Sequence, residues 1–270
     1  MRALLSVLLL AATIARADKV LDVEPVEQAT PVWCWVAVSE MVLRYYDVPN
    51  VNPGGHYQCG FIGLNAVATN AQACNADCRL CNFPAGHANV LKSAFEEYPR
   101  RVALVKSERQ PRLRMTIRAR ALSFDEVMEE IDNERPFIIG ISPAGSPVSN
   151  VSAHVAVIRG YKDEGGRSEV LVNDPFPFER AGSPNPYLRA GGSREEDLSY
   201  WIDIEALKQR LAWRETMLVR KSGTHAKPPA TQAASLCVVN PYGGGCRMAP
   251  GFSLPKGAQC HCAGVPGVAF

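Results

Sequence analysis

Residues 28–46 read QATPVWCWVAVSEMVLRYY, and this stretch decides the fold that we expect. Apolar side chains recur there at helical steps of three and four positions, namely at Val38, Met41, Val42 and Tyr45. Pro31 interrupts regular structure just before them, so Cys34 falls at or near the start of the helix. The free N–H groups and the positive dipole end at that terminus favour a thiolate. Cys34 is therefore a candidate nucleophile, and Gln28 offers a side-chain amide six residues earlier.

A nucleophilic cysteine needs a base, and the base needs a partner that orients it. The segment after residue 150 predicts a β-hairpin whose parts are a strand at 151–161, a Gly-Gly turn at 162–168 and a strand at 169–173. If the hairpin is symmetric about Glu164, the numbers of cross-strand partners sum to 328. His154 would then face Asp174, close enough for the carboxylate to orient the imidazole. Asn173 would point to the opposite face, because side chains alternate along a strand.

These residues, in this order, resemble the papain-like cysteine peptidases. The closer similarity is to a compact bacterial branch that includes double-glycine-type peptidases and plant-pathogen effector peptidases. It rests on the cysteine helix that ends in Tyr-Tyr, the His-Val-Ala-Val strand and the Asn-Asp-Pro turn, and it covers about residues 23–220. The resemblance implies an α+β fold in which the nucleophile helix packs against an antiparallel β-sheet that carries His154 and Asp174.

The resemblance also implies roles for individual side chains. Cys34 would be the nucleophile and His154 the base, while Gln28 and the Cys34 N–H would form the oxyanion hole. Plant-type papains use Asn as the orienting residue, so Asn173 stays an alternative to Asp174. The stretch before Cys34 also lacks their glycine-rich pattern.

The expected function is that of an exported cysteine peptidase that hydrolyses peptide bonds through a thioester intermediate. Three alternatives stay open: acyl transfer by a glutamine deamidase or transglutaminase, a secreted toxin effector, and a noncatalytic binding protein. We expect a peptide or protein substrate, no cofactor and no metal. A net charge of +2 with 21% charged residues gives no indication of a nucleic-acid partner.

The amino-terminal residues predict export. Residues 1–17 have the pattern of a cleaved signal peptide, with Arg2, an apolar core and the site Ala15-Arg16-Ala17. We therefore expect a periplasmic or extracellular protein without stable membrane insertion, because the apolar run is too short to span a bilayer comfortably.

Nine cysteines fit that compartment, because eight can form disulfides and leave Cys34 free. The eight divide into two groups within which we expect pairing: Cys59, Cys74, Cys78 and Cys81; and Cys237, Cys246, Cys260 and Cys262. The spacing in the first group also matches a structural zinc site or, less well, an iron–sulfur cluster, both of which require reduced thiols.

The remaining sequence predicts the domain organisation. A peptidase domain at 18–221 contains a cysteine-rich, loop-like insert at about 52–88, and a linker at 222–235 leads to a disulfide-rich tail at 236–270 that either docks a partner or clips the main domain. Further elements are expected within the domain: helices at 88–98, 123–133 and 204–211, strands at 112–120, 137–141 and 216–220, and a long loop at 175–198. The strand at 112–120 has a basic outer face, which is either an anion site or a solvated surface.

Overall fold

The computed structural model describes most of the chain. Described are residues 18–52, 55–66, 78–142, 154–164 and 166–225, and, in the tail, residues 233–234, 236–239, 245–248, 254–255, 257–262 and 265–269. The predicted signal peptide lies outside the described residues.

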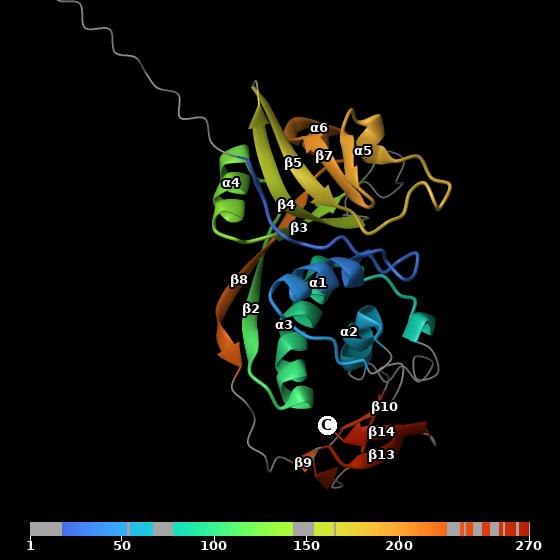
Figure 1. The fold of residues 1–270 in the computed structure, drawn as a ribbon. Coiled ribbons are helices and arrows are strands. Elements are labelled where there is room, and N and C mark those ends of the chain that lie inside the picture. The colour runs from blue at the N-terminus through green and yellow to red at the C-terminus, as the bar shows by residue number, and fades with distance from the viewer. Residues whose placement is uncertain are drawn as a thin grey trace, which may run out of the picture.

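The large sheet is antiparallel and follows the order β2-β8-β3-β4-β5-β7-β6, with β1 paired to β4. Its strands are β1 (Lys19–Val20), β2 (Gln110–Arg118), β3 (Phe137–Ile141), β4 (His154–Glu164), β5 (Arg167–Asn173), β6 (Ser193–Glu196), β7 (Ser199–Asp203) and β8 (Glu215–His225). The long strands β2 and β8 run past the rest of the sheet and flank a helix, α3 (Figure 1).

The described helices pack around this sheet. They are α1 (Cys34–Tyr45), α2 (Tyr57–Ala66), α3 (Ala88–Lys106), α4 (Phe124–Asp132), α5 (Pro186–Arg189) and α6 (Ile204–Arg210), with a short 3₁₀ turn at Cys78–Leu80. The first three form a layer below strands β3, β4 and β5 in Figure 1. This arrangement confirms the predicted α+β class, in which the helix that begins at Cys34 packs against an antiparallel sheet.

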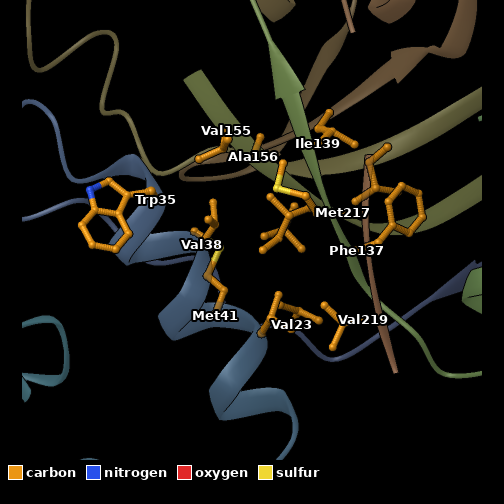
Figure 2. Close-up of a cluster of buried hydrophobic side chains, with 14 of the residues drawn as sticks. Val23, Trp35, Val38, Met41, Phe137, Ile139, Val155, Ala156, Met217 and Val219 are labelled. Atoms are coloured by element: carbon orange, nitrogen blue, oxygen red, sulfur yellow. The ribbon is translucent and has the colours of Figure 1, made fainter. Parts of the chain in front are cut away.

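The contact between α1 and the sheet forms the centre of the core. Val38 and Met41 of α1 point toward side chains of β3, β4 and β8 (Figure 2). The helix is buried on nearly all sides, from Trp35 to Leu43. Because burying a large apolar side chain contributes about 1.5–3 kcal/mol, this contact fixes the start of α1 against the start of β4.

The hairpin of β4 and β5 corrects the predicted register. The strands extend to Glu164 and from Arg167, so the predicted turn at 162–168 was too long. Partner numbers sum to 331 near the turn (Tyr161 faces Val170) and to 330 beyond a bulge at Arg159, not to 328. The bulge inserts one residue and therefore exchanges the faces of the strand that follows.

Two segments that we expected to be loops contain regular structure. Helix α2 lies in the cysteine-rich insert, and the segment 175–198 contains α5 and β6. The predicted helix at 88–98 continues to Lys106. The predicted helix at 123–133 is α4, which begins with a capping box in which Ser123 and Glu126 are bonded reciprocally.

Three disulfides join described cysteines, and each pair lies within one predicted group. Cys59 bonds Cys78, Cys237 bonds Cys260 and Cys246 bonds Cys262. Cys81 is also disulfide-bonded, and Cys74 lies outside the described residues. Among the cysteines that the structure describes, Cys34 alone is free.

The tail forms a small sheet of its own in the order β11-β10-β14-β13, with a separate pair of β12 and β9. Its strands are β9 (Ala233–Ala234), β10 (Leu236–Val239), β11 (Gly245–Arg247), β12 (Leu254–Pro255), β13 (Gln259–Cys262) and β14 (Val265–Ala269). Strand β11 contacts α2. No described helix is both long enough and apolar enough to cross a membrane.

Candidate active site

Cys34 is the first residue of α1, as predicted. The turn ahead of it is held by Trp33, whose backbone N–H donates to the carbonyl of Thr30 and whose indole donates to the carbonyl of Cys81 at 3.0 Å. The Cys34 side chain is partly exposed at the edge of the core. At this terminus the first N–H groups have no acceptor inside the helix, and the positive end of the helix dipole favours a negatively charged sulfur.

His154 is the first residue of β4 and lies against Cys34. Its Nε2 is 2.6 Å from Oδ1 of Asp174, and the Cys34 thiol lines the same pocket as the imidazole and interacts with it electrostatically. Because Nε2 is engaged by Asp174, we assign the thiol contact to Nδ1. The sequence thus correctly identified three side chains that meet in space: a thiol, an imidazole and a carboxylate.

The electrostatics of this cluster favour a charged imidazole. Burial by itself lowers the pKa of His154, but the negative charge and hydrogen bond of Asp174 outweigh it. With a smaller contribution from Cys34, they raise the pKa of His154 to about 10. At neutral pH the imidazole is therefore protonated, and a thiolate beside it would form an ion pair.

Asp174 is fully buried, and three donors hold its carboxylate. Oδ1 accepts from His154 and from the backbone N–H of Phe176 at 2.9 Å, while Oδ2 accepts from the hydroxyl of Tyr187 at 2.8 Å. The Tyr187 ring is buried and stacks on Tyr200 at 4.8 Å. Sequence analysis missed Tyr187, although the Asn-Pro pair before it is a typical helix start that could have revealed α5.

Asn173, the alternative orienting residue, lies in a different network. Its Oδ1 accepts from Arg159 and from Ser199, both at 2.8 Å, and its Nδ2 donates to the carbonyl of Val23. The side chain is fully buried. Asn173 therefore connects β5 to its neighbours, and Asp174 is the residue that contacts His154.

A cavity of about 350 Å³ opens beside the thiol. Cys34 and His154 lie on its wall with Trp35, His87 and Glu215, and the rest of the lining is mainly apolar: Pro31, Val32, Pro84, Ala85, Gly86, Ala88, Leu91, Val155 and Met217. A mostly apolar pocket with a few polar groups is typical of sites that bind small or extended ligands.

His87 is the second histidine of this pocket, and its bonding differs from that of His154. Its Nδ1 accepts from the backbone N–H of Asn89 at 3.1 Å and so caps helix α3. His87 belongs to the insert that we expected to be loop-like, and the structure shows it as a helix cap.

Gln28 is buried near the site and has a partner of its own. Its side-chain Nε2 donates to the carbonyl of Thr30 at 2.8 Å, and its backbone N–H donates to the carbonyl of Pro175. Its Oε1 has no hydrogen-bond partner among the described residues. The first bond uses one of the two amide hydrogens and fixes Gln28 to the turn that precedes Cys34.

The sequence was also compared with known proteins. The sequence model of the Peptidase_C39 like family matches residues 20–205. This span is more than half of the chain and includes Gln28, Cys34, His154 and Asp174. No curated protein matches the chain.

Proposed function

The chain belongs to the Peptidase_C39 like family, and from this premise we propose that it is an exported cysteine peptidase that cleaves peptide bonds through Cys34, His154 and Asp174. The family itself supports cysteine peptidase activity, and the fold agrees with a papain-like one. The observation that carries the assignment of the residues is the 2.6 Å contact of His154 with the buried Asp174, on the wall of the pocket that also contains the Cys34 thiol.

The first half of the reaction forms a thioester. The Cys34 thiolate attacks the carbonyl carbon of the peptide bond, and the carbonyl oxygen becomes an oxyanion. The imidazolium of His154 then gives its proton to the leaving amine as the C–N bond breaks. Asp174 stabilises the imidazolium and fixes the ring, so that the proton is held at the nitrogen that faces the substrate.

The second half returns the enzyme to its starting state. Neutral His154 takes a proton from water, and the hydroxide formed attacks the thioester carbonyl. The C–S bond breaks, which releases the new carboxyl terminus and restores the thiolate beside an imidazolium. No electron donor or cofactor is required for this cycle.

The oxyanion needs donors, and we propose the Cys34 N–H and the side-chain amide of Gln28. The position of Cys34 at the start of α1 supports the first donor, because its N–H has no acceptor inside the helix. The second amide hydrogen of Gln28 supports the second donor, because the bond to Thr30 uses only one. Removing one such donor costs about 2.7–4 kcal/mol of transition-state stabilisation.

Export and the domain organisation belong to the same proposal. The described disulfides support an oxidising compartment outside the cytosol, the periplasm or the extracellular space. We assign residues 18–225 to the peptidase domain, because β8 stays paired in the large sheet to His225, beyond the predicted boundary at 221. Residues 236–270 form an appendage, supported by a sheet and an apolar cluster confined to the tail.

The test is a digest of a proteome-derived peptide mixture by the exported, oxidised protein. The proposal predicts new amino termini with the wild type and none with Cys34→Ala or His154→Ala. His261→Asn is the matched control, because it alters an exposed histidine of the tail, outside the pocket; it should retain hydrolysis. Release of ammonia without new amino termini would instead indicate a deamidase or transglutaminase. Neither product with folded wild type would indicate a binding protein.

A further inference from the structure

A second groove adjoins the pocket beside Cys34 and runs along helix α3. The pocket and the groove share Trp35, which lies between them. The groove measures about 870 Å³, and α3, β2 and the end of β8 form its walls. Apolar and charged side chains both line it, among them Phe83, Val90, Ser93, Ala94, Leu113 and His225.

Four arginines and two glutamates also line the groove, so its charged side chains sum to 4 − 2 = +2. They are Arg100, Arg101, Arg112, Arg114, Glu96 and Glu97. Glu97 binds Arg100 and Arg101, and Glu96 binds Lys92 besides its longer contact with Arg114 at 3.6 Å. The two carboxylates are thus already matched by cations, and the excess charge of the groove is positive.

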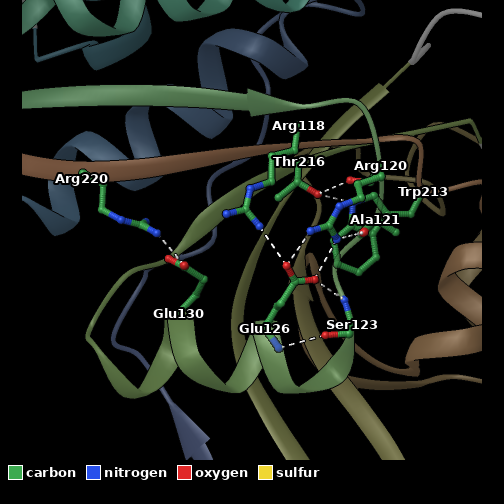
Figure 3. Close-up of polar contacts among 9 residues, drawn as sticks. All are labelled: Arg118, Arg120, Ala121, Ser123, Glu126, Glu130, Trp213, Thr216 and Arg220. Carbon is green, nitrogen blue, oxygen red and sulfur yellow. Dashed lines mark hydrogen bonds and ion pairs between the residues drawn. The ribbon is translucent and has the colours of Figure 1, made fainter.

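Arg112 is the one arginine in the lining of the groove that takes part in none of these ion pairs. It is exposed, lines the groove, and has no carboxylate partner among the described residues. At and just beyond the other end of β2, Arg118 and Arg120 both bind Glu126 of α4 (Figure 3). The alternating arginines of this strand therefore serve two purposes: those near α4 hold the helix, and those at the other end face the groove.

The pKa of His225 is affected by the positive charges that line the groove. Its Nε2 is buried and has no hydrogen-bond partner within the described part of the chain. Burial lowers the pKa of His225, and the charges of Arg112, Arg100 and Arg114 lower it further, against the opposite effect of Glu97. The cationic side chains therefore dominate the potential at this site.

We infer that this groove binds acidic residues of the peptide substrate, on one side of the bond that is cleaved. The inference rests on the proposed function, because the groove adjoins the pocket at Trp35 and both are lined by α3. Leu91 in the pocket and Arg101 in the groove lie ten residues apart on α3, a rise of about 15 Å along its axis. An extended peptide covers that distance with about four or five residues, so the acidic positions fall at that spacing from the pocket.

The tail of the chain does not fit this groove by charge. Residues 226–270 contain Lys227, Arg247 and Lys256 and neither Asp nor Glu. Like charges would oppose its insertion between the arginines. The complementary occupant is therefore an acidic segment of a substrate chain and not the protein's own tail.

Binding to the Cys34→Ala variant tests this inference without requiring turnover. The probes are two peptides that carry an uncharged dye, one with alternating Leu and Glu and one with Gln at every Glu position. We expect the Glu peptide to bind more tightly, and the preference to decrease with added salt as exposed charges are screened. Arg112→Glu should reduce its affinity by about fivefold or more, since exposed ion pairs contribute up to about 1 kcal/mol and a reversed charge adds repulsion.

Arg167→Glu is the matched control. It reverses another exposed arginine, the first residue of β5, at the tip of the β4–β5 hairpin. The tip lies at the top of Figure 1, whereas α3 lies in its lower half. This variant should leave both affinities as they are. Equal binding of the two peptides, or equal losses in the two variants, would overturn the inference and leave the proposed peptidase activity intact. If the wild type hydrolyses no peptide but the Glu peptide still binds more tightly than the Gln peptide, the proposed peptidase activity is wrong and the acidic preference of the groove stands.

Discussion

The guanidinium Nε of Arg159 donates a 2.8 Å hydrogen bond to Oδ1 of Asn173, one residue before the carboxylate that holds His154. Arg159 is also the extra residue of the bulge in β4. Without the bulge, partner numbers would keep the sum of 331, and Asn173 would share the face of His154. The bulge changes this sum to 330, so Asp174 lies on that face, diagonal to His154.

A reciprocal pair of nearly isosteric changes tests this division of roles. Asp174→Asn keeps the shape but removes the charge that stabilises the imidazolium. We expect kcat to fall about tenfold to 10²-fold, because the change removes only part of the rate enhancement that a positioned acid–base group contributes. Asn173→Asp places a charge beside Arg159 and should leave kcat close to that of the wild type. Steady-state kinetics on one peptide compares the two, and an Asn173→Asp loss as large as that of Asp174→Asn would reverse the assignment.

Tyr187 is expected to position Asp174. Tyr187→Phe removes the donor to Oδ2 and leaves a buried carboxylate oxygen without a partner, which costs about 1–3 kcal/mol. We expect a lower melting temperature and a smaller loss of kcat than in Asp174→Asn, with a changed pH profile. The control is Tyr46→Phe, because the buried hydroxyl of Tyr46 has no hydrogen-bond partner among the described residues. Identical pH profiles for wild type and Tyr187→Phe would reduce Tyr187 to a packing residue.

The His154–Asp174 pair predicts a specific dependence on pH. The folded-state pKa of His154 is raised to about 10 from an ordinary 6.5, so folding favours the protonated ring. The stabilisation is fully present below pH 6.5 and decreases as the pH rises toward 10. NMR titration of the imidazole should give a midpoint near 10 in the wild type and a lower one in Asp174→Asn. A wild-type midpoint near 6.5 would contradict the ion pair.

The sequence predicted those parts of the site that depend on local pattern. The apolar stripe and Pro31 identified α1, and strand alternation put Asp174 on the correct face although the register was wrong by two. The predicted partner sum of 328 and the observed sum of 330 differ by two residues, and a shift of two keeps each side chain on the same face of the strand. The bulge at Arg159 has no signal in the sequence, because it depends on contacts of Arg159 with residues far along the chain.

The missed helices have a similar explanation. Helix α2 contains glycines and lacks a strong periodic pattern, so it was expected to be a loop. At Gly60 a Cβ atom would lie 2.8 Å from Oδ1 of Asn50 and 3.1 Å from the backbone nitrogen of Asn52. This glycine therefore permits close packing of the helix against the preceding segment. Tertiary contact and the Cys59–Cys78 disulfide, not helix propensity, stabilise α2.

Two disulfides with loops of similar length should have different consequences for activity. Cys59–Cys78 closes 19 residues and Cys237–Cys260 closes 23, so each should stabilise its region by about 2–4 kcal/mol. The first lies next to Cys81, whose carbonyl accepts from Trp33 at the start of α1. Serine replacement of the first pair should lower kcat and increase hydrogen exchange near Cys34. Replacement of the tail pair should loosen the tail alone, and an equal effect on kcat would disprove this link.

The most direct test of the central claim is active-site labelling of the oxidised, exported protein with a thiol-directed peptide epoxide. Mass spectrometry then identifies the modified cysteine. The account predicts a label on Cys34 alone, lost in His154→Ala and retained in His261→Asn. An unlabelled Cys34 in the folded wild type, or a label on Cys34 that does not depend on His154, would contradict an activated nucleophile at the start of α1.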